Sequence, residues 1–179
     1  TPDMEKPLVP KLVHDLLPRA KLIAALRNPV DRAFSQYQHN LKVEGREPLS
    51  FEEAIARSAG NPAGEFMQDE KDGEPKKQRN YLTRGFYDEQ LERWYAYYPK
   101  DRIHIICSEE FFADPGATLK EVVRFLELPD FHFDCLVPRH VGGYQDSMSR
   151  EMKTYLEEIF RPHNRKLYEL TGKDFGWPA

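Results

Sequence analysis

Apolar residues along this chain fall into two patterns, short continuous runs and helically spaced positions. Two short runs, residues 22–26 and 102–107, have the length and the aliphatic content of buried β-strands. Elsewhere apolar residues recur three and four positions apart, which is the spacing of one face of an α-helix. Strands separated by helices predict a parallel sheet with flanking helices, the three-layer arrangement of α/β proteins.

The helical spacing predicts helices in several segments: residues 11–17, residues 29–41, a segment opened by a Ser50–Glu53 capping box, residues 86–98, a segment from Pro115, and a region from about Ser149 to Gly172. Asn28 and Asp114 stand immediately before two of these segments, and both residue types favour the N-cap. In the last region we expect Pro162 to break or restart the helix, because proline removes a backbone hydrogen bond.

The strongest candidate for a functional site is the junction between the first strand and the helix that follows it. The strand ends at Arg27, and Asn28 and Pro29 suit the N-cap and the first helical position. Unpaired N–H groups and the helix dipole at such a start favour negative charge. Arg27 adds a forked cationic donor and Ser35 a hydroxyl. The junction therefore predicts an anion site, although an ordinary strand–loop–helix unit with a surface arginine would show the same spacing.

A specific family resemblance is carried by the run Arg27-Asn28-Pro29-Val30-Asp31-Arg32-Ala33-Phe34-Ser35-Gln36-Tyr37. It resembles the segment with which sulfotransferases hold the 3′-phosphate of 3′-phosphoadenosine 5′-phosphosulfate (PAPS). The resemblance extends over residues 11–41, 84–110 and 139–177, which are similar to bacterial sulfotransferases related to the heparan sulfate N- and O-sulfotransferases. It implies that Arg27 and Ser35 bind the 3′-phosphate of PAPS, or of the product 3′-phosphoadenosine 5′-phosphate (PAP).

The same resemblance implies a P-loop NTPase-like α/β fold. Two strands are too few for a stable sheet of that kind, so we expect the chain to be the C-terminal part of the fold, with residues 1–179 forming one domain. No Gly-rich loop followed by Lys and Ser/Thr occurs in the 179 residues, whereas the family cradles the 5′-phosphosulfate with such a loop.

Catalysis of sulfuryl transfer needs that cradle, a cation at the bridging oxygen and a base for the acceptor, by analogy with phosphoryl transfer. Thr1-Pro2 resembles the end of the family's Glu-Lys-Ser/Thr-Pro segment, which would put the catalytic lysine before residue 1. We interpret Glu5-Lys6-Pro7 as a coincidental match. The catalytic residues of the reaction are therefore left unknown in this chain.

A second cofactor-binding segment is implied by the resemblance at Arg139-His140-Val141-Gly142-Gly143-Tyr144, where the family has a basic, glycine-containing loop. Glycine lets backbone N–H groups approach a phosphate closely. Arg139, Gly142 and Gly143 are therefore further predicted cofactor contacts, with a simple Gly-Gly turn as the alternative.

A substrate-facing segment is implied at residues 81–85, because the corresponding family segment lies beside the cofactor and the acceptor. Tyr81 and Arg84 are the predicted contacts, and a helix-entry turn with a solvated arginine is the alternative. The polar residues 59–80 before it form either a solvated insert or a lid over the substrate.

Composition and charge narrow the partners. A formal net charge of −4 disfavours a nucleic-acid binder, and no apolar run approaches membrane-spanning length. Cys107 and Cys135 make no disulfide framework, Cys107 is expected to be a small buried residue, and no Cys/His spacing resembles a metal site. These features favour a cytoplasmic protein without a metal site. The acceptor of a sulfotransferase is not readable from them and stays open between a carbohydrate, a lipid, a peptide and another small molecule, because variable loops build the acceptor cleft. The oligomeric state stays open.

Three functions remain at this point. The first is a PAPS-dependent sulfotransferase represented by its C-terminal portion. The second is a non-catalytic nucleotide- or phosphate-binding module or partner subunit, which the missing Gly-rich loop would explain. The third is a P-loop kinase relative, which would need a base clamp and magnesium ligands upstream.

Overall fold

The computed structural model describes residues 6–42, 47–60, 80–131, 133 and 147–179. Its sheet consists of β1 (Leu22–Leu26) and β2 (Ile103–Cys107), which pair in parallel with Leu22 opposite Ile103 and Leu26 opposite Cys107. The prediction of two parallel strands from the apolar runs is therefore confirmed, although β1 is not buried throughout, since Ile23 is 42% exposed. Because the strands are parallel and in this register, the residues that follow their carboxyl ends meet at one edge of the sheet.

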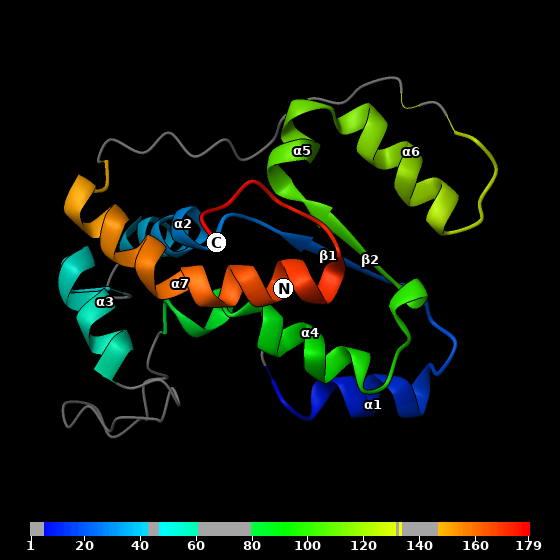
Figure 1. Cartoon of the computed structure of the whole chain (residues 1–179), viewed down its shortest axis with the longest axis horizontal. Coiled ribbons are helices and arrows are strands. Elements are labelled where there is room, and N and C mark those ends of the chain that lie inside the picture. The colour runs from blue at the N-terminus through cyan, green and yellow to red at the C-terminus, as the bar shows by residue number, and fades with distance from the viewer. Residues whose placement is uncertain (1–5, 43–46, 61–79, 132, 134–146) are drawn as a thin grey trace.

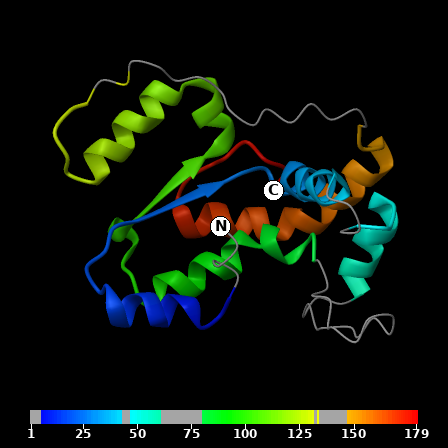
Figure 2. The same ribbon diagram turned by 180° about the vertical axis from the view of Figure 1, so that it is seen from behind.

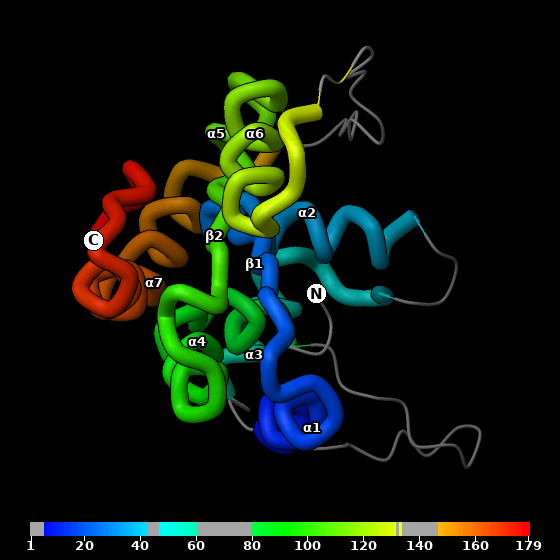
Figure 3. Tube along the Cα trace, turned by 90° about the vertical axis from the view of Figure 1, so that its right-hand side faces the viewer, coloured from blue at the N-terminus to red at the C-terminus, as the bar shows by residue number. Residues whose placement is uncertain are grey.

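Helices surround the two strands (Figure 1). Their bounds are α1 (Val9–Leu16), α2 (Pro29–Lys42), α3 (Phe51–Gly60), α4 (Tyr87–Tyr95), α5 (Ser108–Ala113), α6 (Pro115–Phe125) and α7 (Arg150–Thr171), with 3₁₀ turns η1 (Thr83–Gly85) and η2 (Lys100–Arg102). Helices α5 and α6 lie on one side of the strands and α1 and α4 on the other, as the reverse and side views also show (Figures 2 and 3).

Two clusters of buried side chains hold these elements together. The first joins the sheet to α4, the second half of α7 and the C-terminal segment: Ala24, Leu26, Tyr87, Leu91, Trp94, Tyr98, Ile103, Cys107, Leu167, Phe175 and Trp177. The second joins α2, α3 and the first half of α7: Val30, Ala33, Tyr37, Phe51, Ala54, Ile55, Tyr81, Leu82, Leu156 and Phe160. Helix α7 therefore links the sheet to the layer formed by α2 and α3.

The expected break at Pro162 is wrong, because α7 continues through it from Arg150 to Thr171. Proline removes one hydrogen bond of the helix and crowds the preceding turn, at a cost of about 3 kcal/mol. The fully buried Leu156 and Phe160 before it and Leu167 after it pack into the two clusters, and this packing offsets the cost. The predicted end at Gly172 is confirmed, since the glycine is left-handed with φ 71°.

The predicted starts of α3 and α6 are confirmed, whereas α1 begins at Val9, two residues before the predicted start. Asp114 accepts a hydrogen bond from the Ala117 N–H at 2.9 Å. Ser50 and Glu53 form the expected reciprocal capping box, with distances of 2.9 Å and 3.2 Å between backbone nitrogens and side-chain oxygens. These local bonds fix where α6 and α3 begin.

Helix α1 is less buried than its apolar spacing suggests. Leu12 and Leu16 are 57% and 80% exposed, whereas Val13 packs against the first cluster. Within the described part of the chain, no helix has the length and apolarity to span a membrane.

Candidate functional site

Arg27 follows the last residue of β1 and precedes the first turn of α2. Arg27 is half-buried, and no other side chain of the described segments forms an ion pair or a hydrogen bond with its guanidinium. A cation with spare donors therefore stands directly before a helix N-terminus, where the helix dipole also favours negative charge. The two features together suit an anionic group.

Asn28 confirms the predicted N-cap of α2. Its Oδ1 accepts from the Val30 N–H at 3.0 Å, and its carbonyl accepts from the Arg32 N–H at 2.9 Å. Pro29 has no N–H to offer. The expectation of unpaired amides at this helix start is thus only partly met, because the Val30 N–H donates to the cap and the Asn28 N–H donates to Glu109, while the Arg32 bond is the first regular bond of the helix. Attraction of an anion here relies on the dipole and on side chains.

Ser35 lies on α2 and is half-buried. It comes seven residues after Asn28, so the two share a helix face about 10 Å apart along the axis. On the same face is Arg32, whose guanidinium donates to Gln36 Oε1 at 2.7 Å and to the carbonyl of Tyr81. Ser35 therefore shares a face of α2 with the cap residue that follows Arg27, and Arg32 between them ties α2 to residue 81.

The peptide group between Arg27 and Asn28 is bonded at both ends. The Tyr87 hydroxyl donates to the Arg27 carbonyl at 3.0 Å, and the Asn28 N–H donates to Glu109 Oε1 at 2.8 Å. Burial raises the pKa of Tyr87, with Arg32 the strongest opposing influence, so the hydroxyl stays a donor at neutral pH. The sequence interpretation missed Glu109. The signal was available, because Glu109 follows β2 as Arg27 follows β1, and parallel strands end at one edge.

Tyr81 lies in the second cluster rather than on a surface. Its ring is fully buried, its hydroxyl donates to Glu47 and accepts from Asn40 Nδ2 at 3.0 Å, and its N–H donates to Ser58 Oγ at 3.1 Å. The Glu47 side chain is itself inaccessible and lies 3.4 Å from an Arg57 nitrogen. A substrate contact by Tyr81 stays a prediction, and this geometry favours a structural role instead.

Arg84 belongs to η1, which packs on α2. It is half-buried. The predicted contacts Arg139, Gly142 and Gly143 lie outside the described residues, as does most of the polar stretch 59–80. Among the residues that are described, no group of His, Cys, Asp and Glu side chains has the arrangement of a metal site.

A parallel sheet with flanking helices matches a known protein class. The family model of the sulfotransferase domain matches residues 4–137. The chain therefore belongs to the sulfotransferase family, and its fold is the P-loop NTPase-like α/β fold of these enzymes.

Curated relatives and a solved structure give the same assignment. The chain is 30% identical to the human bifunctional heparan sulfate N-deacetylase/N-sulfotransferase 2, over 93% of its own length and 20% of the relative's. It is 28% identical to human heparan sulfate glucosamine 3-O-sulfotransferase 6, over 94% of the chain and 52% of that protein. A membrane-associated sulfotransferase of Dictyostelium discoideum is also 28% identical, with 90% and 48% covered.

A crystal structure of a sulfotransferase from Alicyclobacillus acidocaldarius superposes with a TM-score of 0.77 at 27% identity. The match covers 99% of this chain and 65% of that one. The chain thus spans between a fifth and about two thirds of the length of these similar proteins.

Proposed function

We propose that the protein carrying this chain transfers a sulfuryl group from PAPS to an amine or hydroxyl, and that this chain binds the 3′-phosphate of the donor. The observation that carries the proposal is the Arg27 guanidinium, which forms no hydrogen bond or ion pair with the described residues and stands before the start of α2. Arg27 binds the phosphate through charge-assisted hydrogen bonds, and Ser35 adds a neutral one.

The residues of this chain hold and orient the donor; the remaining functions lie elsewhere. A cradle for the 5′-phosphosulfate, a cation at the bridging oxygen and a base for the acceptor complete the reaction. We assign these to a P-loop segment outside the 179 residues, since no Gly-rich loop followed by Lys and Ser/Thr occurs within them. PAPS, when bound, supplies the activated sulfuryl group.

For the acceptor we propose a carbohydrate. Support comes from the relatives, whose names specify heparan sulfate N-sulfation and glucosamine 3-O-sulfation. The half-buried Arg84 on η1 suits an anionic or hydroxyl-rich acceptor next to the donor, because guanidinium groups donate in a fixed fork. A radiolabelled-sulfate transfer assay with amine-bearing and N-sulfated glycans, lipids and small alcohols separates the acceptor classes.

Titration calorimetry with PAP on the full-length protein tests the donor site. Arg27→Ala is expected to weaken binding about 10- to 100-fold, since a charge-assisted contact is worth about 1.5–3 kcal/mol. Ser35→Ala should weaken it by a smaller factor, because it loses one neutral bond. Arg165→Ala removes an equal charge from an exposed position of α7 and serves as the matched control. Equal affinity of wild type and Arg27→Ala for PAP removes the assignment, and PAP binding without any sulfuryl transfer favours a non-catalytic binding module.

A further inference from the structure

We propose that Tyr87 and Glu109 are positioning residues that fix the direction of the Arg27 side chain toward the 3′-phosphate. The inference rests on the proposed function, because it assigns a task at the same phosphate site. Neither residue needs to touch the donor. Both act through the backbone on either side of the peptide bond that joins Arg27 to Asn28.

The two contacts act on a single rigid unit. The carbonyl of Arg27 and the N–H of Asn28 are the two polar ends of the same planar peptide group. The Tyr87 hydroxyl holds the first end at 3.0 Å and the Glu109 carboxylate holds the second at 2.8 Å. A planar group bonded at opposite ends has little freedom to rotate about its flanking single bonds.

Tyr87 is itself firmly anchored. It is the first residue of α4, is 6% exposed and belongs to the first cluster, where its ring lies 6.0 Å from that of Trp177. The ring therefore has a fixed place in the core, and its hydroxyl reaches Arg27 from the opposite side of the peptide to Glu109.

Glu109 is held through its second oxygen. Its Oε2 accepts from the Cys107 thiol at 3.1 Å, while Oε1 receives the Asn28 N–H at 2.8 Å. Burial raises the pKa of Cys107, so the thiol remains protonated and able to donate at neutral pH. Since Cys107 ends β2, the bond connects the carboxyl ends of both strands through one carboxylate.

The orientation of this peptide determines where the Arg27 guanidinium points. It sets ψ of Arg27 and φ of Asn28, and hence both the Arg27 side-chain direction and the cap that Asn28 forms on Val30. A phosphate that meets a pre-oriented guanidinium loses less binding free energy to ordering than one that meets a mobile loop. The benefit is specific to ligands that carry the 3′-phosphate.

Glu109 also places a negative charge near the proposed phosphate site. Two substitutions separate the effect of this charge on PAP binding from the effect of the hydrogen bond to Asn28. Glu109→Ala removes both the charge and the acceptor for the Asn28 N–H. Glu109→Gln removes the charge but keeps an acceptor oxygen. If positioning dominates, Gln preserves the 3′-phosphate preference and Ala reduces it. If the charge alone matters, both substitutions strengthen PAP binding.

The test compares PAP with adenosine 5′-phosphate, which lacks the 3′-phosphate, by titration calorimetry on the full-length protein. The dissociation constant for adenosine 5′-phosphate divided by that for PAP measures the contribution of the 3′-phosphate to binding. We expect Tyr87→Phe and Glu109→Ala each to lower this ratio about 3- to 10-fold, as one lost hydrogen bond allows, by weakening PAP alone. A general loss of folding would weaken both ligands and leave the ratio unchanged.

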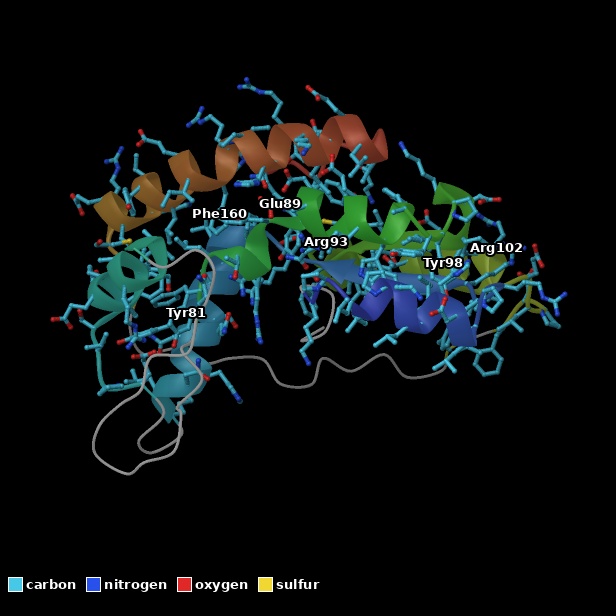
Figure 4. All side chains as sticks on the ribbon, turned by 90° about the horizontal axis from the view of Figure 1, so that it is seen from below. Tyr81, Glu89, Arg93, Tyr98, Arg102 and Phe160 are labelled. Atoms are coloured by element: carbon cyan, nitrogen blue, oxygen red, sulfur yellow. The ribbon has the colours of Figure 1, made fainter. Side chains whose placement is uncertain are left out.

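A double-mutant cycle tests whether the two residues act through Arg27. In the Arg27→Ala background, Tyr87→Phe should cause no further change, so that the double variant and Arg27→Ala have the same ratio of dissociation constants. Tyr98→Phe is the matched control, because the Tyr98 hydroxyl also donates to a backbone carbonyl, that of Leu17 at 2.8 Å, at the far end of the molecule from Tyr81 (Figure 4). It should lower the melting temperature and keep the wild-type ratio.

The outcomes distinguish this inference from the proposed function. If wild type binds PAP no better than adenosine 5′-phosphate, the phosphate site itself is wrong. If Arg27→Ala collapses the ratio while Tyr87→Phe and Glu109→Ala both keep it, the site stands and the positioning role is overturned. Additive effects of Tyr87→Phe and Arg27→Ala would also overturn it, since they would show that Tyr87 acts independently of Arg27.

Discussion

Gly85 lies so close to Phe160 that a Cβ placed on the glycine would be 2.6 Å from the Cε1 atom of the phenylalanine. The same Cβ would be 3.0 Å from the Cβ of Pro29, the first residue of α2. Phe160 is fully buried on α7 and is labelled in Figure 4. The absence of a side chain at residue 85 therefore lets η1, and with it Arg84, pack against the start of the helix that carries the proposed phosphate site.

The first prediction follows from this contact. Gly85→Ala should lower the free energy of unfolding by about 1–3 kcal/mol, because either a buried ring or the start of α2 must move. Urea denaturation followed by circular dichroism measures the loss. Gly116→Ala is the matched control, since a Cβ there meets only Asp114 Oδ1 at an ordinary 3.5 Å and alanine favours the helix. Equal stabilities of the two variants would show that η1 adjusts freely.

The second prediction concerns the buried hydroxyl of Tyr81. Tyr81→Phe leaves Glu47, whose side chain is inaccessible, without one of its donors, and should cost about 1–3 kcal/mol of stability. The KM for the acceptor should stay unchanged, because the ring keeps its place in the core. Tyr155→Phe, on an exposed position of α7, is the control for stability. A raised acceptor KM with unchanged stability would instead establish Tyr81 as a substrate contact.

Local patterns predicted the secondary structure well because each signal acts within a few residues. The apolar run before Arg27 gave β1, and Asn28, Ser50 and Asp114 marked helix starts through bonds to their own next turn. Pro162 was misinterpreted because continuation of α7 depends on packing against distant helices, which proline chemistry alone does not reveal.

The residues of the candidate site also fall into two groups, those that local sequence predicts and those that only the tertiary structure brings in. Arg27 and Ser35 are linked by the geometry of one strand and one helix, so the sequence alone predicted them together. Glu109 meets Asn28, 81 residues earlier in the chain, only because β2 pairs with β1 in register. Tyr81 has a turn-like sequence context, and only the packing of α2 and α3 reveals that its hydroxyl lies beside a buried carboxylate.

The third prediction concerns pH. Burial lowers the pKa of His104 below its ordinary 6.5, with Glu121 opposing the shift, and the ring stacks on Phe125 with centroids 5.1 Å apart. Below pH 6.5, His104 therefore binds a proton more readily in the unfolded chain than in the folded one. The contribution of neutral His104 to the free energy of unfolding is therefore complete above pH 6.5, and it is lost as the pH falls through the lower pKa of the folded state. His104→Phe keeps the stacking and should flatten the stability profile below pH 6.5, as urea midpoints at several pH values would show. An unchanged profile contradicts the assignment.

The fourth prediction uses the thiol of Cys107 as a reporter of the contacts at the carboxyl ends of the strands. The residue is 2% exposed, burial raises its pKa, and its proton is donated to Glu109. In a Cys135→Ser background, where Cys107 is the sole thiol, a disulfide reagent should react on the order of 100-fold more slowly with the native protein than with the chain in denaturant, because only the accessible thiolate attacks. Glu109→Ala should speed the native reaction, since it removes both the hydrogen-bond acceptor and the nearby negative charge that favour the neutral thiol. Equal reaction rates with and without Glu109→Ala would mean that Glu109 does not restrain the end of β2. That result would contradict the proposal that one carboxylate ties β2 to the Arg27–Asn28 peptide.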